Sequence, residues 1–298
     1  MSYLYWKKFR GFNYLLLLIM FCSMALACSS DKAEEGRTLS KVIVGLSPGE
    51  SVENLKKRFL PLMSYLSKDT GLKFELYIPE TYAGLMDAFD QEKVDMALFG
   101  GVLFVKAHHQ YQAVPLAMRD IDLHFFSYYL ANSKFKSNKL TDYKDKRFSF
   151  GAKLSTSGHI MPRFYMQDSG IFPDTFFSEI KYSGKHDQTA YWIRDGEVDL
   201  GVASSPIIDK MYANGSLLKK DVRIIGQTPE FPDYVWAIQP SISNSQQIKI
   251  RDAFLNLTLE DEEHRKILKL LNADHFLPVQ IEEFAKMRKV LEELGMLN

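Results

Sequence analysis

Ser155, Thr156 and Ser157 form a run of small hydroxyl side chains between two different sequence patterns. Residues 148–150, Phe-Ser-Phe, have the pattern of a short strand, and residues 160–165 carry apolar side chains at helical spacing. Ser and Thr at such a joint mark the start of a helix, whose first N–H groups have no partner within the helix. Hydroxyls and free N–H groups together bind oxyanions, so we expect an oxyanion site here. The alternative is an ordinary helix cap without a ligand.

The charge balance of the chain excludes one class of partner. Its 298 residues include 37 Lys and Arg against 37 Asp and Glu, and 46% of them are hydrophobic. This is the composition of an ordinary globular protein with a large core. Because non-specific nucleic-acid binding depends on an excess of positive charge, we expect no nucleic-acid partner. An oxyanion site is compatible with zero net charge, since backbone dipoles and hydroxyls bind anions.

The N-terminus has the pattern of a lipoprotein signal peptide over residues 1–27. Basic residues precede an apolar stretch, residues 12–27, that is shorter than the roughly 20 residues of a membrane span. It ends in small residues before Cys28, as in the cleavage site of bacterial lipoproteins. We therefore expect a lipid on Cys28, a flexible tether over residues 28–40, and an extracytoplasmic (periplasmic) location at the membrane. The alternative is an uncleaved N-terminal anchor helix.

Strand-like and helix-like segments alternate along the rest of the chain, which predicts an α/β fold with mainly parallel sheets. Residues 92–100 (EKVDMALFG) and 196–204 (GEVDLGVAS) repeat one pattern, and each repeat ends in small residues. Two such halves predict two lobes joined by extended crossovers. We expect residues 41–130 with 236–298 in the first lobe and residues 131–235 in the second.

Ligands of open α/β sheets bind beyond the carboxyl ends of the strands. Small and hydroxyl residues gather at these predicted ends, although turn residues are common at any sheet edge. The residues are Ser47, Tyr82, Gly100, Ser155, His186 and Ser204. We expect a cleft between the two lobes to bring them together.

Several segments resemble one known family, the phosphonate-, phosphite- and phosphate-binding proteins of ABC transporters. The most specific segments are residues 148–165, with STSG followed by Pro-Arg, and residues 184–187, Gly-Lys-His-Asp; the likeness covers residues 44–294. The resemblance implies the two-lobed fold of type II periplasmic binding proteins. It also implies a monomer that is not an enzyme, without a cofactor, and with two partners: a small oxyanion and the permease of an ABC transporter. We expect no metal site, because His108 and His109 are adjacent on a predicted helix and face different ways.

The resemblance also assigns ligand contacts. It implies that the hydroxyl residues 155–157 hold the anion through their hydroxyls and helix-start N–H groups, and that Tyr82 reaches it from the first lobe. It further implies that His186 donates to one oxygen, while Asp233 accepts a hydrogen bond from a protonated oxygen. The alternatives are a helix cap at His186 and a plain turn at Asp233. The implied ligand-binding set is Tyr82, Phe104, Ser155, Thr156, Ser157, His186, Ser204, Asp233 and Tyr234.

The chain departs from the family pattern at two places. Phe104 stands where Tyr is common, and Gly100-Gly101 replaces Gly-Pro before it, so one hydroxyl contact is absent. Members that take aminoalkyl phosphonates have an acid near the end of a second-lobe strand, whereas residues 204–206 are Ser-Ser-Pro. These differences favour a small ligand: phosphate, phosphite or methylphosphonate.

Closure of the two lobes around the anion is the mechanism that we expect, with hinges near residues 128–132 and 235–238. Two other functions fit the same residues. A sensor would bind the same ligand and pass a signal to a different partner. A serine hydrolase would use Ser155 as nucleophile and His186 as base, but no Gly-x-Ser-x-Gly elbow surrounds Ser155.

Overall fold

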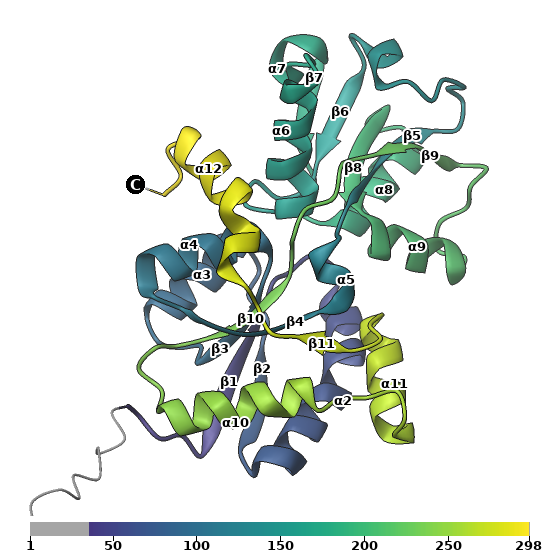
Figure 1. Cartoon of the computed structure of the whole chain (residues 1–298). Coiled ribbons are helices and arrows are strands. Elements are labelled where there is room, and N and C mark those ends of the chain that lie inside the picture. The colour runs from purple at the N-terminus through teal and green to yellow at the C-terminus, as the bar shows by residue number, and fades with distance from the viewer. Residues whose placement is uncertain (1–35, 298) are drawn as a thin grey trace, which may run out of the picture. The chain divides into compact units, whose positions relative to one another are not determined.

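The computed structural model describes residues 36–297, and Figure 1 shows the order of their helices and strands. The signal peptide predicted at residues 1–27, the predicted lipidation site Cys28 and the first part of the predicted tether lie outside the described residues. Within the described range, no helix is both long and apolar enough to cross a membrane.

Six strands form the first sheet, in the order β11-β4-β10-β3-β1-β2. They are β1 (Lys41–Leu46), β2 (Lys73–Tyr77), β3 (Met96–Phe99), β4 (Val114–Arg119), β10 (Val235–Ile238) and β11 (Phe276–Leu277). Helices cover both faces, which explains why strands such as β3 are buried along their whole length. One face carries α2 (Val52–Thr70), α10 (Asn244–Leu255) and α11 (Glu262–Leu271), and the other carries α3 (Tyr82–Asp90), α4 (Gly101–Tyr111) and α12 (Ala285–Glu293).

Five strands form the second sheet, in the order β7-β6-β8-β5-β9. They are β5 (Ser127–Asn132), β6 (Arg147–Phe150), β7 (Glu179–Tyr182), β8 (Leu200–Ser204) and β9 (Val222–Gln227). Its helices are α6 (Met161–Asp168), α7 (Pro173–Phe176), α8 (His186–Asp195) and α9 (Ser205–Ala213), and the short α5 (Asp120–Leu123) precedes this lobe. Figure 1 shows the two sheets as separate bodies, each with its own helices, so the predicted two-lobed α/β architecture is confirmed.

Each sheet also contains antiparallel strands, which the prediction of mainly parallel sheets did not include. Strand β10 is antiparallel to β3 and β4 in the first sheet, and β5 is antiparallel to β8 and β9 in the second. Both strands enter their sheet from the other lobe rather than from a helix of the same lobe. Because a helical crossover within one sheet is what imposes parallel pairing, these two strands are free to pair in the antiparallel sense.

Two connecting segments pass between the lobes and pair with each other at Phe125 and Phe231. The Phe125 N–H donates to the Phe231 carbonyl at 3.1 Å, and the Phe231 N–H donates back at 2.8 Å. The hinges predicted at residues 128–132 and 235–238 fall within β5 and β10, which the two sheets hold in place. An apolar extended pattern predicts a strand without indicating which sheet it joins. The position of the hinge and the lobe boundaries remain predictions.

The C-terminal segment consists of a 3₁₀ turn, Ile281–Phe284, followed by α12. Helix α12 packs on α4 of the first lobe. Its Lys286 ammonium also lies over two rings of α6, 5.3 Å from the Phe164 centroid and 4.7 Å from the Tyr165 centroid. The last helix therefore contacts both lobes.

Candidate functional site

The hydroxyl run lies at a helix start, as the sequence predicts. The Gly151 N–H donates to the Gly158 carbonyl at 2.8 Å, which closes the loop after β6. Ser155 is the N-cap, and its Oγ accepts a hydrogen bond from the Gly158 N–H at 3.0 Å. The first turn, η2 (Thr156–Ile160), is π-helical, and α6 continues from it with Pro162 near its own start. Such π-helical turns are frequent at functional sites.

The start of η2 leaves hydrogen-bond donors for a ligand. The first N–H groups of a helix have no intrahelical partner, and Ser155 caps only the N–H of Gly158. The N–H groups of Thr156 and Ser157 are therefore left for a ligand. The three hydroxyl residues are each at most 2% exposed, so an anion held here would be shielded from water, which strengthens its electrostatic interactions.

His186 provides a neutral donor from the first turn of α8, where it is 1% exposed. Its Nδ1 accepts a hydrogen bond from the Ser204 N–H at 3.1 Å, so the ring carries its proton on Nε2. Burial lowers the pKa of His186 to about 4, which keeps the ring neutral at pH 7. Its Nε2 is buried and has no hydrogen-bond partner among residues 36–297, so the Nε2–H is available to a ligand.

Asp233 provides the complementary acidic group. Its Oδ1 accepts a hydrogen bond from the Gly101 N–H at 2.8 Å, whereas the buried Oδ2 has no well-oriented partner in the described part of the chain. Burial raises the pKa of Asp233 to about 7, although the Gly101 N–H and the hydroxyls of Thr156 and Ser157 oppose this shift. A carboxyl group that titrates near 7 can share a proton with an oxyanion, whereas a fully charged one would repel it.

Tyr82 brings a hydroxyl group from the first lobe. It is the first residue of α3, is buried, and hydrogen-bonds with Ser155 of the second lobe. Burial raises the pKa of Tyr82 well above its ordinary value, so the hydroxyl keeps its proton. A Cβ atom added at Gly49 would lie 3.1 Å from the Tyr82 Oη and 3.4 Å from the His186 ring, so these two groups flank one small space. The structure thus brings the hydroxyl run, Tyr82 and His186 together.

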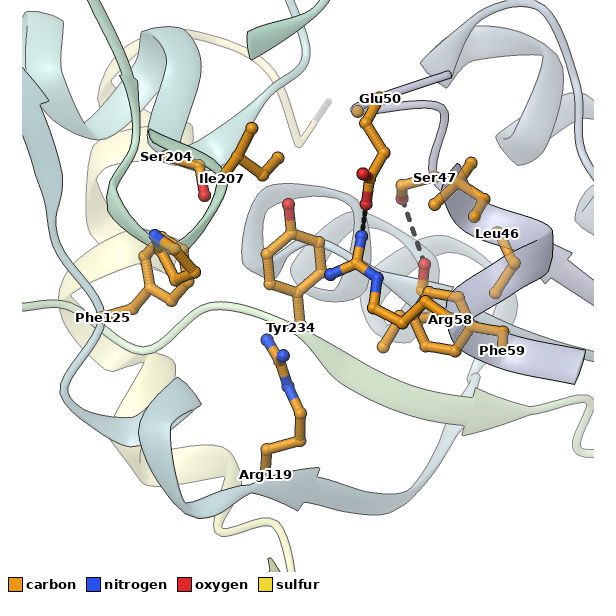
Figure 2. Close-up of a pocket in the computed structure, with 14 residues that line it drawn as sticks. Leu46, Ser47, Glu50, Arg58, Phe59, Arg119, Phe125, Ser204, Ile207 and Tyr234 are labelled. Atoms are coloured by element: carbon orange, nitrogen blue, oxygen red, sulfur yellow. Dashed lines mark hydrogen bonds and ion pairs between the residues drawn. The ribbon is translucent and has the colours of Figure 1, made fainter. Parts of the chain in front are cut away.

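Three further residues of the predicted set have supporting positions. The Phe104 ring packs in the core against Phe284, with ring centroids 5.0 Å apart. Ser204 contributes its N–H, which orients the His186 ring. The Tyr234 ring lines a cavity beside the site, as Figure 2 shows. The structure therefore assigns packing, orientation and cavity lining to these residues, and direct contact with a ligand remains a prediction for the whole set.

The cavity beside the site contains charged residues that we did not predict. Its volume is about 30 Å³, and Glu50, Arg58, Arg119 and Tyr234 line it (Figure 2); we call it the arginine cavity. Arg58 forms an ion pair with Glu50, which also pairs with Lys210 of the second lobe at 3.1 Å. Arg58 follows two lysines on α2, a pattern typical of a solvent-exposed helix face, so no sequence signal marked it as buried.

The geometry disfavours a serine hydrolase. The general base would have to accept the Ser155 proton, but the His186 Nε2 already carries a proton, because Nδ1 is the acceptor. Residues 45–49, GLSPG, do have the spacing of a nucleophile elbow. There, however, the Ser47 Oγ donates to a backbone carbonyl at 3.1 Å, and the following Pro48 has no N–H for an oxyanion hole.

Comparisons with known proteins agree with this geometry. Residues 44–284 match the sequence profile of the periplasmic phosphonate substrate-binding proteins of ABC transporters. The chain belongs to this family. One relative is the probable ABC transporter phosphite-binding protein PhnD1 of Prochlorococcus marinus, 28% identical over 265 residues, which are 85% of this chain and 88% of the relative. Another is the phosphonates-binding periplasmic protein of Escherichia coli, 24% identical over 258 residues, which are 84% and 75% of the two chains.

Solved structures of the family have the same fold. The structure of PhnD1 from P. marinus in complex with methylphosphonate has a TM-score of 0.81 at 25% identity and covers 86% of this chain and 99% of that one. A phosphonate transporter binding protein of Pseudomonas aeruginosa has a TM-score of 0.77 at 22% identity and covers 86% of each chain. The predicted fold of type II periplasmic binding proteins is thereby confirmed. The chain is therefore an extracytoplasmic substrate-binding protein of an ABC transporter, and the role of its family is in transport.

Proposed function

We propose that the chain captures a small phosphorus oxyanion between its two lobes and delivers it to the permease of an ABC transporter. The observation that carries the proposal is the convergence of the Tyr82 hydroxyl, the η2 start and the His186 Nε2–H on one buried space. The Asp233 carboxyl lies beside the same hydroxyl run. Because these groups come from both lobes, a bound anion would bridge the lobes and favour their closure.

Phosphate, phosphite and short alkylphosphonates are the ligands that we propose. Each carries negative charge on its oxygens and exchanges a proton near pH 7. Such an anion accepts from the donors at residues 155–157 and His186, and it shares its proton with Asp233, whose pKa is about 7. Sulfate is also a tetrahedral oxyanion but has no proton to share at pH 7, so we expect it to bind much more weakly.

The relatives support this class of ligand. The P. marinus protein is named for phosphite, and its solved structure contains methylphosphonate. Both ligands are small. The sequence Ser-Ser-Pro at residues 204–206, which provides no acid at this strand end, is consistent with a ligand that lacks an amino group.

Calorimetric titration of the purified full chain in detergent tests the proposal. We expect saturable binding of at least one of phosphate, phosphite and methylphosphonate, with sulfate about 100-fold weaker or more. Ser155→Ala combined with Ser157→Ala removes two hydrogen bonds to a charged ligand and should weaken binding by about 100-fold or more. Ser169→Ala, at the exposed end of α6, is the matched control. If the folded wild type binds none of the three phosphorus anions, the proposal is wrong.

Attachment to the membrane through Cys28 is a separate part of the proposal. The small residues before Cys28 support removal of residues 1–27 and lipidation of the new N-terminus, with residues 28–40 as the tether. Metabolic labelling with a radioactive fatty acid should label the wild type and fail to label Cys28→Ser. Equal labelling of the two proteins would contradict lipidation at this residue.

A further inference from the structure

The arginine cavity shares part of its wall with the proposed oxyanion site. Gly49 lines the cavity, and a Cβ atom at this residue would lie 3.1 Å from the Tyr82 hydroxyl. Ser204 also lines it, and its N–H donates to His186. Tyr234 lines it and directly follows the proton-sharing aspartate in the chain. A substituent on the phosphorus of a bound anion would therefore have this cavity beside it.

The volume of the cavity fits a short substituent. The cavity measures about 30 Å³. A buried water needs about 10 to 15 Å³ of such volume, so there is room for about two water-sized groups. A substituent of a few heavy atoms has this size, whereas a long alkyl chain does not.

The charged groups around the cavity leave an excess of positive charge. Glu50 is 2% exposed and is already paired with two cations, Arg58 and Lys210. Arg119 is paired with Asp122 through two hydrogen bonds, of 2.7 Å from Nε and 2.6 Å from Nη2. Of the charged side chains that line the cavity, two are cations, Arg58 and Arg119, and one is a carboxylate, Glu50. An ammonium group would find no free acid here, whereas an added carboxylate would balance the charge.

Arg58 is the cation whose charge is least balanced. Its Nε is buried and has no hydrogen-bond partner within residues 36–297. Burial, followed by the nearby charge of Arg119, lowers the pKa of Arg58 to about 10. A guanidinium with an open donor in such a shielded place binds carboxylates well, because its planar donors match their geometry.

We propose that the arginine cavity is a subsite for the substituent on phosphorus and that it selects short phosphonates with a carboxylate over those with an ammonium group. This inference rests on the proposed capture of a phosphorus oxyanion and deepens it, because it specifies the charge of the substituent. Arg58 is the residue that determines the selectivity. Arg119, which Asp122 fixes in place, supplies a second positive charge beside the Tyr234 ring, 5.6 Å from its centroid.

Four ligands test this inference by calorimetric titration of the full-length wild type in detergent. They are phosphonoacetate, its neutral analogue phosphonoacetamide, 2-aminoethylphosphonate and methylphosphonate. We expect phosphonoacetate to bind about tenfold tighter than phosphonoacetamide, and 2-aminoethylphosphonate to bind weakest. If methylphosphonate binds but phosphonoacetate binds no better than its amide, or the aminoalkyl ligand binds best, the inference is wrong and the proposed function stands. If the folded protein binds none of the four, the inference is wrong, and the proposed function is also wrong only if phosphate and phosphite fail to bind as well.

The variant Arg58→Met tests the residue itself. We expect the ratio of phosphonoacetate to phosphonoacetamide affinity to fall to about one, since the ratio depends on the charge of Arg58. Should the loss of one partner of the buried Glu50 prevent folding, Glu50→Gln combined with Arg58→Met provides the same measurement. Arg251→Met, on α10 with its side chain 42% exposed, is the matched control and should keep the wild-type ratio. A wild-type ratio in Arg58→Met would overturn the role of Arg58.

Discussion

The two helices that meet at the site begin in different ways, and the first of them, α4, begins as a contact between the lobes. Its N-cap, Gly100, has no side chain to cap the helix. Groups from elsewhere in the chain bind the first N–H groups instead: the Gly101 N–H donates to the Asp233 Oδ1 at 2.8 Å, and the Val102 N–H donates to the Thr156 Oγ1 at 2.9 Å. The free N–H groups of α4 therefore help to hold the second lobe against the first.

The π-helical turn η2 uses the same feature for a different purpose. Its own Ser155 caps one N–H, that of Gly158, and the earlier N–H groups are left for a ligand. The difference lies in the cap residue, because a glycine lets a partner group approach closely. A Cβ atom at Gly100 would lie 3.1 Å from the Thr156 Oγ1 and 3.3 Å from the Asp233 Oδ1. The comparison shows that unpaired N–H groups at a helix start can serve closure or ligand binding, and that the cap residue and its surroundings decide which.

The variant Gly158→Ala disrupts the start of η2, and we expect it to have the largest effect on affinity. The new Cβ atom would lie 2.9 Å from the Ser155 Oγ and 3.0 Å from the His186 Cε1, so both proposed ligand groups must move. We expect the affinity for the preferred anion to fall about 100-fold or more by calorimetry, because two hydrogen bonds to a charged ligand are misaligned.

The control for this variant is Gly226→Ala in β9. A Cβ atom there would meet only the Tyr129 ring, at 3.9 Å, which is ordinary contact, so we expect wild-type affinity. Thermal unfolding of both variants separates loss of binding from loss of folding. Near wild-type affinity in a folded Gly158→Ala would show that neither Ser155 nor His186 contacts the anion.

The variant Thr156→Val removes the contact between Thr156 and the start of α4, and we expect a smaller effect on affinity. Valine keeps the shape of threonine but leaves the buried Val102 N–H without its acceptor, which costs about 1 to 3 kcal/mol. Because this bond joins the two lobes, we expect the closed form to lose that stability and the affinity to fall about tenfold. Small-angle X-ray scattering should show a less compact protein at a given ligand concentration.

Two further variants sharpen this test. Thr156→Ser keeps the hydroxyl and should restore closure, whereas Thr175→Val removes an exposed threonine hydroxyl outside the site and should change nothing. If Thr156→Ser binds as weakly as Thr156→Val, the methyl group of Thr156 rather than its hydrogen bond is responsible, and α4 is not the contact that holds the closed form.

The fold was predictable where burial alone sets the sequence pattern. The β-branched run Lys41–Leu46 is typical of a strand and forms β1, and apolar residues at helical spacing are typical of a helix and form α2, because each element has a buried side that repeats along the chain. Strand β4 has a less clear pattern, since Pro115 interrupts it. The antiparallel pairing of β5 and β10 was missed for another reason: the choice of a sheet depends on contacts between residues far apart in the sequence.

The hydroxyl run and the arginine cavity also differ in how far the sequence predicts them. The hydroxyl run was predictable because its cap is local, with Ser155 bonding to the N–H three residues later. The arginine cavity was not, because Arg58 comes from α2 and Arg119 from β4, and only the folded chain places them together. A charged residue is usually exposed, so its sequence neighbours indicate a solvated surface until the tertiary contacts are known.

The pH dependence of binding should distinguish the proton-sharing acid from the N–H donors. Since the pKa of Asp233 is raised to about 7, its carboxyl is protonated below that pH and can donate to the anion, and it is charged above it and repels the anion. We expect the wild-type affinity to decline between pH 6 and pH 8.5 by about fivefold more than that of Asp233→Asn. The asparagine still offers an oxygen to the Gly101 N–H, so the α4 contact is retained.

The ligand also titrates in this range, so the informative quantity is the difference between the two proteins. Calorimetric titrations at matched ionic strength over the pH series provide it. Asp209→Asn, an exposed acid on α9, is the control and should follow the wild-type curve. Parallel curves for the wild type and Asp233→Asn would contradict proton sharing by Asp233.

The smallest effect should come from the outer contact between the lobes, that of α12 with α6. The Lys286 ammonium lies over the rings of Phe164 and Tyr165, and such a contact near the surface contributes about 0.5 to 1 kcal/mol. Lys286→Met removes the charge but keeps a long apolar side chain that still packs on the rings, so we expect the affinity to fall less than about threefold. Lys289→Met, which removes an exposed lysine of the same helix, is the control. If Lys286→Met weakens binding as much as Thr156→Val, then α12 rather than the start of α4 is the main contact that holds the lobes closed. The start of α4 would then not have the closing role that distinguishes it from the start of η2.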